Sequence, residues 1–224
     1  AELEIGWLPV LQQTAGNPLL RPGQPGMFEA YRYVEMLEIP AKLDRAEGDV
    51  HPYGNPHIQT DPRNIAKVAA ALAERLAEID PAQAGIYRAR YGEFERRWSD
   101  AISQWSASAA ALKGLPVISH HKYWSYLYKW LDMREVATLE PKPAVPPSAA
   151  HLAELLRRQQ AERAKLIVYS SYNDPQPSEW LAARSRIRRV KLPASVGGVE
   201  GTDDLFKYFD VLLNRLLQAV GGPQ

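Results

Sequence analysis

Apolar side chains recur at helical intervals through the first half of the chain. Between residues 62 and 79 they lie on one face of an amphipathic helix. They are Ile65, Val68, Ala69, Leu72 and Leu76. Asp61 is a good N-cap and Pro62 suits the first helical position, so the start is well defined. Asp80-Pro81 repeats this start signal and Gly114 is a natural C-cap, which predicts a helix of about thirty residues and about 45 Å between them.

The pattern changes after residue 115, where short apolar runs alternate with amphipathic stretches. The runs predict strands at 116–119, 135–139, 166–169 and 187–192. The stretches between and after them predict helices at 122–131, 149–161, 178–185 and 203–220. Short apolar strands that alternate with helices are typical of a parallel sheet covered on both faces. The sequence therefore predicts an α/β fold.

Polar side chains follow two of these strands directly. His120 and His121 come after the first strand, and Tyr172–Asp174 after the third. Ligands of parallel α/β sheets bind beyond the carboxyl ends of the strands. Two adjacent histidines do not both face one ion there, and the aromatic residues that follow favour His121 as the inward one.

Histidine also marks a turn-rich segment in the first half. His57 follows Pro56 and lies just before the helix that starts at Pro62. It is either a metal ligand or a loop histidine satisfied by hydrogen bonds. His51, flanked by Pro52, is expected to be exposed, and His151 to lie on the surface of a helix.

Composition narrows the function classes. The 224 residues suit one large domain or two small lobes, and a net charge of +1 argues against a nucleic-acid binder. The absence of cysteine excludes disulfides, thiol nucleophiles and iron–sulfur clusters. The start, Ala1–Glu4, does not have the pattern of a signal peptide. One run of cations is expected to be a solvated strand edge rather than a phosphate site: Arg184, Arg186, Arg188, Arg189 and Lys191.

Three segments together resemble the zinc and manganese solute-binding proteins of bacterial ABC importers. They are 48–57 (GDVHPYGNPH) followed by Asp61-Pro62, 117–126 (VISHHKYWSY), and 139–152 with its proline-rich start (LEPKP). The resemblance implies two lobes with parallel sheets flanked by helices, joined by a long rigid helix. Residues 1–80 would be the remainder of the N-terminal lobe, 81–113 the connecting helix and 114–224 the C-terminal α/β lobe.

The resemblance also implies a metal site made of three histidines and a carboxylate. His57 and His121 match two of the histidines. Asp204 is the favoured carboxylate, with Asp203 and Asp174 as alternatives. The cargo would be zinc, or else manganese or iron, and the partner the membrane permease of the importer. The protein would be periplasmic, or exported and membrane-anchored with its signal peptide removed, and it would not be an enzyme.

One departure from the family pattern concerns the first histidine, which belongs to a segment that would precede Ala1. The first lobe is therefore expected to be incomplete, with a dimer or a domain swap covering its exposed sheet edges. His51 is a candidate substitute ligand. Two alternatives remain open: a truncated interaction module or adhesin that binds no metal, and a metal-dependent hydrolase with Asp174 or Glu140 as general base.

Overall fold

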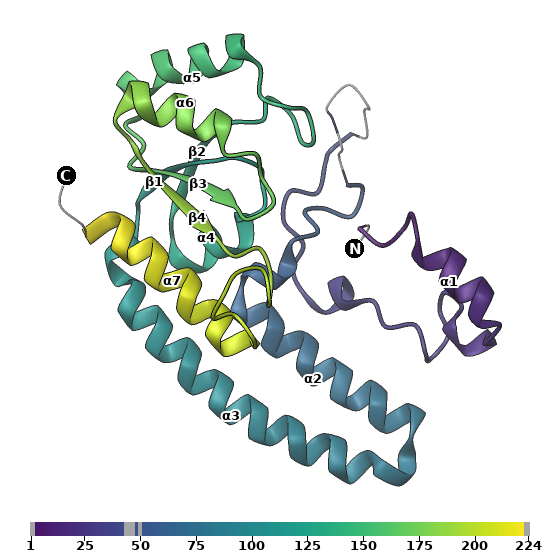
Figure 1. The fold of residues 1–224 in the computed structure, drawn as a ribbon. Coiled ribbons are helices and arrows are strands. Elements are labelled where there is room, and N and C mark those ends of the chain that lie inside the picture. Colours follow the sequence, from purple (N-terminus) through teal and green to yellow (C-terminus); the bar gives the residue numbers. More distant parts are fainter. Residues whose placement is uncertain (1–2, 43–47, 49–50, 222–224) are drawn as a thin grey trace. The chain divides into compact units, whose positions relative to one another are not determined.

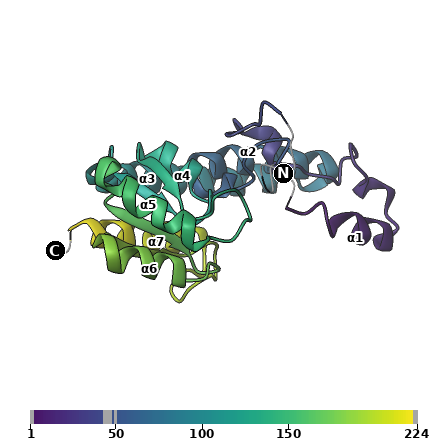
Figure 2. The same ribbon diagram turned by 90° about the horizontal axis from the view of Figure 1, so that it is seen from above.

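The computed structural model describes residues 3–42, 48 and 51–221, and the chain divides into two compact units. Unit 1 comprises residues 3–42 and 51–102 of this set, and unit 2 comprises residues 48 and 103–221. Figures 1 and 2 show their elements from two directions. No described helix is both long enough and apolar enough to cross a membrane. The three-part division at residues 80 and 113 stays a prediction.

The described part of unit 1 consists of helices and turns. Its α-helices are α1 (Leu8–Ala15), α2 (Pro62–Ile79) and the larger part of α3 (Ala84–Ser108). Its 3-10 turns are η1 (Pro18–Leu20), η2 (Ala30–Tyr33), η4 (Ile58–Thr60) and η5 (Pro81–Gln83). Helix α2 has the predicted limits, because the Asp61 carboxylate accepts the N–H of Arg63 and caps the first turn.

The predicted thirty-residue helix is shorter and begins differently. Asp80 provides no side-chain cap, and its carboxylate instead accepts the Tyr87 hydroxyl at 3.1 Å. The chain therefore passes through the 3-10 turn η5 before α3 begins at Ala84. The C-terminal end tightens into a second 3-10 turn, η6 (Ala109–Leu112), as helix ends often do.

Unit 2 contains a four-stranded parallel sheet. Its strands are β1 (Pro116–Ser119), β2 (Arg134–Thr138), β3 (Leu166–Ser170) and β4 (Arg188–Leu192). Its helices are α4 (Ser125–Leu131), α5 (Ala149–Glu162), α6 (Gln176–Ser185) and α7 (Leu205–Gly221). The strand order is β2-β1-β3-β4, so the predicted α/β class and parallel sheet are confirmed.

Both faces of the sheet are covered, as the apolar strands require. Ile118 and Ile167 pack with α5 and α6 in one buried cluster. Ser119 points to the opposite face, where its hydroxyl bonds to the buried Tyr128 hydroxyl of α4 at 2.8 Å. Figure 1 shows α7 on the side of the sheet away from α5 and α6. The chain leaves β1 through α4 and adds β2 at one edge of β1, then crosses back and adds β3 at the other edge of β1. The carboxyl end between β1 and β3 is the switch point where α/β sheets bind ligands.

Candidate metal centre

His120 lies at this switch point because the sheet continues one residue past Ser119. The N–H of His120 donates to the Val168 carbonyl of β3 at 2.8 Å, and its carbonyl accepts the N–H of Glu140 at 3.1 Å. These two bonds hold His120 between β3 and the residues that follow β2. Its side chain is consequently buried, with a relative exposure of 5%.

The surroundings of the His120 imidazole favour its neutral form. Its buried Nδ1 has no hydrogen-bond partner among the described residues. Burial lowers the pKa of His120 below its ordinary value, and His121 acts in the same direction, while Glu140 and Asp174 oppose them. A neutral imidazole is the form that binds metal ions.

His121 occupies a different position from the one predicted. Its side chain is 25% exposed, and its Nδ1 lies 2.7 Å from the Glu140 carboxylate, which also accepts the N–H of Ala144 at 3.0 Å. This partial exposure differs from the inward position expected of it, because His120 is the last residue inside the sheet and His121 the first to leave it, while the assignment of His121 as a metal ligand stays a prediction. A carboxylate on Nδ1 orients the ring and leaves Nε2 as the nitrogen for a ligand.

The predicted carboxylates lie at helix starts in unit 2. Asp204 is exposed, and its Oδ1 accepts the N–H of Lys207 at 2.9 Å, which caps α7. Asp203 pairs with the Lys207 ammonium at 2.9 Å. Asp174 is also exposed and accepts the N–H of Gln176 at 3.0 Å at the start of α6. Each of these carboxylates thus has a structural role that uses one of its oxygens.

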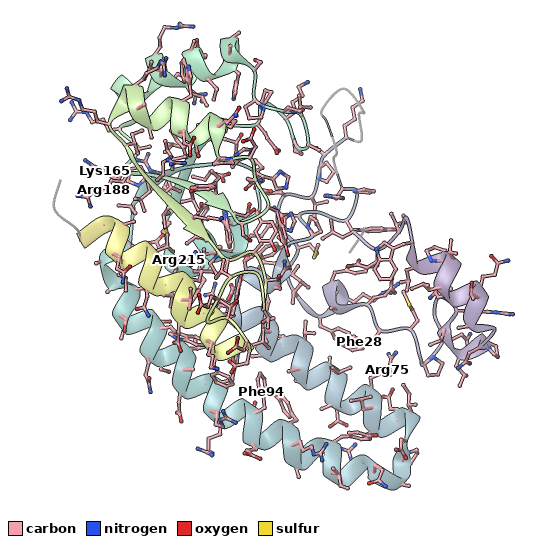
Figure 3. The ribbon with its side chains drawn as sticks, viewed as in Figure 1. Phe28, Arg75, Phe94, Lys165, Arg188 and Arg215 are labelled. Carbon is pink, nitrogen blue, oxygen red and sulfur yellow. The ribbon has the colours of Figure 1, made fainter. Side chains whose placement is uncertain are left out.

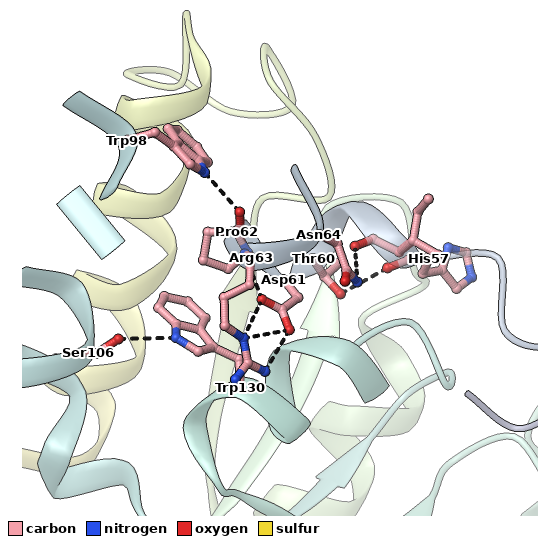
Figure 4. Close-up of polar contacts among 10 residues, drawn as sticks. His57, Thr60, Asp61, Pro62, Arg63, Asn64, Trp98, Ser106 and Trp130 are labelled. Atoms are coloured by element: carbon pink, nitrogen blue, oxygen red, sulfur yellow. Dashed lines mark hydrogen bonds and ion pairs between the residues drawn. The ribbon is translucent and has the colours of Figure 1, made fainter. Parts of the chain in front are cut away.

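His57 is held rigidly in unit 1. Its side chain is buried, and its N–H donates to Asn55 Oδ1 at 3.0 Å. Its carbonyl accepts the Thr60 hydroxyl at 3.0 Å, as Figure 4 shows. The next turn is fixed as well, because the Asn64 amide donates to the Ile58 carbonyl at 3.1 Å. His57 therefore lies just before the start of α2, as predicted, with a buried side chain, and its role as a metal ligand stays a prediction.

The start of α2 is anchored from α3. The indole N–H of Trp98, a side chain only 1% exposed, donates to the Pro62 carbonyl at 2.8 Å (Figure 4). Asp61 receives the Arg63 guanidinium through both carboxylate oxygens. Cap, ion pair and indole together fix the helix start that follows His57.

The other histidines differ from their expected exposure. His51 is half-buried rather than exposed. His151 is also half-buried, because its Nε2 lies 3.0 Å from the Thr138 carbonyl. Among the residues that the structure describes, no three His, Asp or Glu side chains form a metal-binding group. The structure therefore brings His121 together with Glu140 within unit 2, and the set of His57, His121 and Asp204, which draws on both units, stays a prediction.

A family model for the periplasmic component A of the zinc-uptake complex, ZnuA, matches residues 10–219. The chain belongs to the ZnuA family. This family consists of metal-binding, periplasmic solute-binding proteins of ABC transporters rather than enzymes. The predicted family is thereby confirmed.

Several solved structures of other proteins share the fold of this chain. A crystal structure of ZnuA matches with a TM-score of 0.72 and 19% identity over 95% of this chain and 74% of that one. FpvC of Pseudomonas aeruginosa in complex with Mn²⁺ matches with a TM-score of 0.71 and 20% identity, over 90% of this chain and 74% of FpvC. A mutant of the laminin-binding adhesin Lmb of Streptococcus agalactiae matches with a TM-score of 0.66 and 18% identity, over 84% of this chain and 70% of the adhesin. No curated protein sequence gives a match.

Proposed function

We propose that this chain captures a divalent metal ion in the periplasm, zinc first and manganese second, and delivers it to the permease of an ABC importer. The observation that carries the proposal is His120, a buried imidazole at the β1–β3 switch point whose Nδ1 has no hydrogen-bond partner among the described residues. A buried polar group without a partner costs free energy. Coordination of a metal ion by this ring would offset that cost.

The proposed ligands come from both units. His57 supplies an imidazole from unit 1, and Asp204 supplies the carboxylate from unit 2. The assignment of His57, His121 and Asp204 stays a prediction, and His120 joins it as the buried alternative to His121. If His121 is the ligand, Glu140 orients its ring; if His120 is the ligand, Glu140 serves mainly the loop after β2.

Zinc titration by calorimetry tests the proposal. The parent chain should bind one zinc ion, and the heat should be lost in His57→Ala and in whichever of His120→Ala and His121→Ala removes the ligand. His151→Ala is the matched control, because His151 already bonds to a backbone carbonyl. Binding should weaken as the pH falls, since the imidazoles must be neutral to coordinate. A parent chain that binds no zinc and no manganese would contradict metal capture and favour the adhesin or interaction module.

Two conservative variants separate the ligand assignments. Glu140→Gln should lower zinc affinity roughly 10- to 100-fold if His121 is a ligand, because it loses the carboxylate that orients the ring. It should have little effect if His120 alone binds the metal. Asp204→Asn keeps an oxygen that can cap α7 and removes the charge. Loss of zinc affinity in Asp204→Asn with an intact fold would therefore identify a ligand rather than a cap.

Competition between zinc and manganese would establish the preferred cargo. Uptake by cells that carry the importer, with and without this chain, would test delivery to the permease. The dimer or domain swap stays a prediction, which light scattering would test.

A further inference from the structure

All four strands of unit 2 begin at the same edge of the sheet, and that edge is strongly basic. We define the amino edge as residues 113–116, 132–134, 163–166 and 186–188, the segments that lead into the four strands. It holds six cations and one carboxylate. The cations are Lys113, Arg134, Arg163, Lys165, Arg186 and Arg188. The whole chain has a net charge of only +1, so this excess is local.

The strand register places these cations in one row. Pro116 of β1 lies opposite Arg134 of β2, and Leu166 of β3 opposite Arg188 of β4. The N–H of Lys165 donates to the Pro116 carbonyl at 2.8 Å, which joins the two halves of the row. Neighbouring strands lie about 4.8 Å apart, so the row extends about 14 Å across the sheet. Figure 3 labels Lys165 and Arg188 at this edge.

Most charges of the amino edge face solvent, whereas Arg188 is half-buried and its guanidinium donates to the Ala219 carbonyl of α7 at 2.8 Å. Arg134, Lys165 and Arg186 are exposed and form no ion pair with any described carboxylate. The one carboxylate of the edge, Asp132, lies 3.5 Å from the Lys113 ammonium, and both side chains are about three-quarters exposed. Such an exposed pair neutralises little, so most of the positive charge remains available.

Helix dipoles explain only part of this pattern. The connecting helices end at the amino edge, and one cation at each helix C-terminus is favourable. However, Arg163 and Arg186 have left-handed backbones (φ 49° and 61°), a conformation that glycine adopts more easily. Gly114 fills the comparable position before β1, with φ 72°. Asp132 fills the comparable position before β2, with φ 52°, so two of the three side chains at these strained positions are arginines.

The opposite edge of the sheet carries the opposite charge. The connections that follow the strands (119–124, 138–148, 170–176 and 192–204) contain five carboxylates and two lysines. These residues are Glu140, Asp174, Glu200, Asp203, Asp204, Lys122 and Lys142. Unit 2 is thus positive at its amino edge and negative at the edge that carries His120.

We propose that the amino edge is a docking surface for a bilayer of anionic phospholipids. An exposed row of cations fits an extended anionic surface. Arg186 and Arg188, two of the strand-edge cations expected to be merely solvated, belong to this row. Each cation near an anionic bilayer strengthens binding by about fivefold.

Vesicle co-sedimentation tests this docking surface. The full chain should bind vesicles of phosphatidylglycerol and phosphatidylcholine but not phosphatidylcholine alone, and raised salt should release it. The triple variant Arg134→Gln, Lys165→Gln and Arg186→Gln should bind about a hundredfold more weakly. The control triple Lys67→Gln, Arg90→Gln and Arg96→Gln removes the same charge from exposed positions of unit 1 and should bind like the parent.

Circular dichroism of both triple variants is the control for folding, and both should give the spectrum of the parent chain. No binding to anionic vesicles, or equal loss in the two triples, would overturn the proposal. Binding of poly-glutamate without vesicle binding would also overturn it and indicate an acidic protein partner.

Discussion

Asp61-Pro62 and Asp80-Pro81 both precede helical turns, so a comparison of the two tests how much a capping carboxylate stabilises a helix start. At the first, Asp61 Oδ1 accepts the N–H of Arg63 at 2.8 Å, and the carboxylate also receives the Arg63 guanidinium, with Nη2 at 2.7 Å. At the second, Asp80 precedes Pro81 but caps nothing. Asp61→Ala should therefore destabilise the protein, whereas Asp80→Ala is a matched control.

The magnitudes follow from burial. The Asp61 side chain is 5% exposed and that of Arg63 is 45% exposed. Loss of the cap costs about 1 kcal/mol, and the half-exposed ion pair adds at most about 1 kcal/mol, so Asp61→Ala should cost about 2 kcal/mol. Asp61→Asn keeps a capping oxygen and should cost less than about 1 kcal/mol. Asp80→Ala removes no cap and loses only the bond from the Tyr87 hydroxyl, so it should cost about 0.5–1 kcal/mol.

Urea unfolding followed by circular dichroism measures these differences, and hydrogen exchange of the Arg63 amide reports on the first turn of α2. The amide should exchange faster in Asp61→Ala and stay protected in Asp61→Asn. Equal losses in the two variants would mean that the ion pair, not the cap, holds the helix start. A loss in Asp80→Ala as large as that in Asp61→Ala would refute the distinction between the two starts.

Three further predictions concern backbone, packing and pH. Gly54→Ala should destabilise more than Gly114→Ala, since both have positive φ but a Cβ at Gly54 would lie 2.5 Å from a backbone carbonyl oxygen; urea unfolding compares them. Trp98→Phe should cost about 1–2 kcal/mol in the same assay, because a buried carbonyl loses its indole donor. Burial raises the pKa of Tyr128 and Tyr208, so stability should be full below about pH 10 and fall as the pH rises toward the folded pKa. In an absorbance titration these two of the eleven tyrosines should ionise only on unfolding, and normal titration of all eleven in the folded protein would contradict this.

The sequence predicted the elements whose ends carry their own signals. Asp61 and Pro62 define the start of α2, and β1 has the predicted limits 116–119. The long helix was less predictable, because the partner of Asp80 is Tyr87, seven residues away, rather than the next turn of backbone. Local patterns thus located the elements but did not show which of two donors, a backbone N–H or the Tyr87 hydroxyl, the Asp80 carboxylate accepts.

The candidate site shows a similar limit at Asp204. The final helix was expected to begin at residue 203, whereas α7 begins at Leu205. The shift of two residues makes Asp204 a capping residue, a position at which aspartate is among the preferred residue types. Which carboxylate has an oxygen left for a metal therefore depends on where the helix starts, a boundary that local patterns define poorly.

The choice between His120 and His121 depends on how far a parallel ladder runs. A buried strand reads as a continuous apolar run, and by that criterion β1 ends at Ser119. Its ladder nevertheless continues through His120, whose N–H bonds to β3 and whose carbonyl bonds to the residue after Leu139. The residue that the ladder holds becomes buried and unable to turn away, while the next residue is free to meet Glu140. One residue of strand length thus gives two adjacent imidazoles different environments, one desolvated and one oriented by a carboxylate.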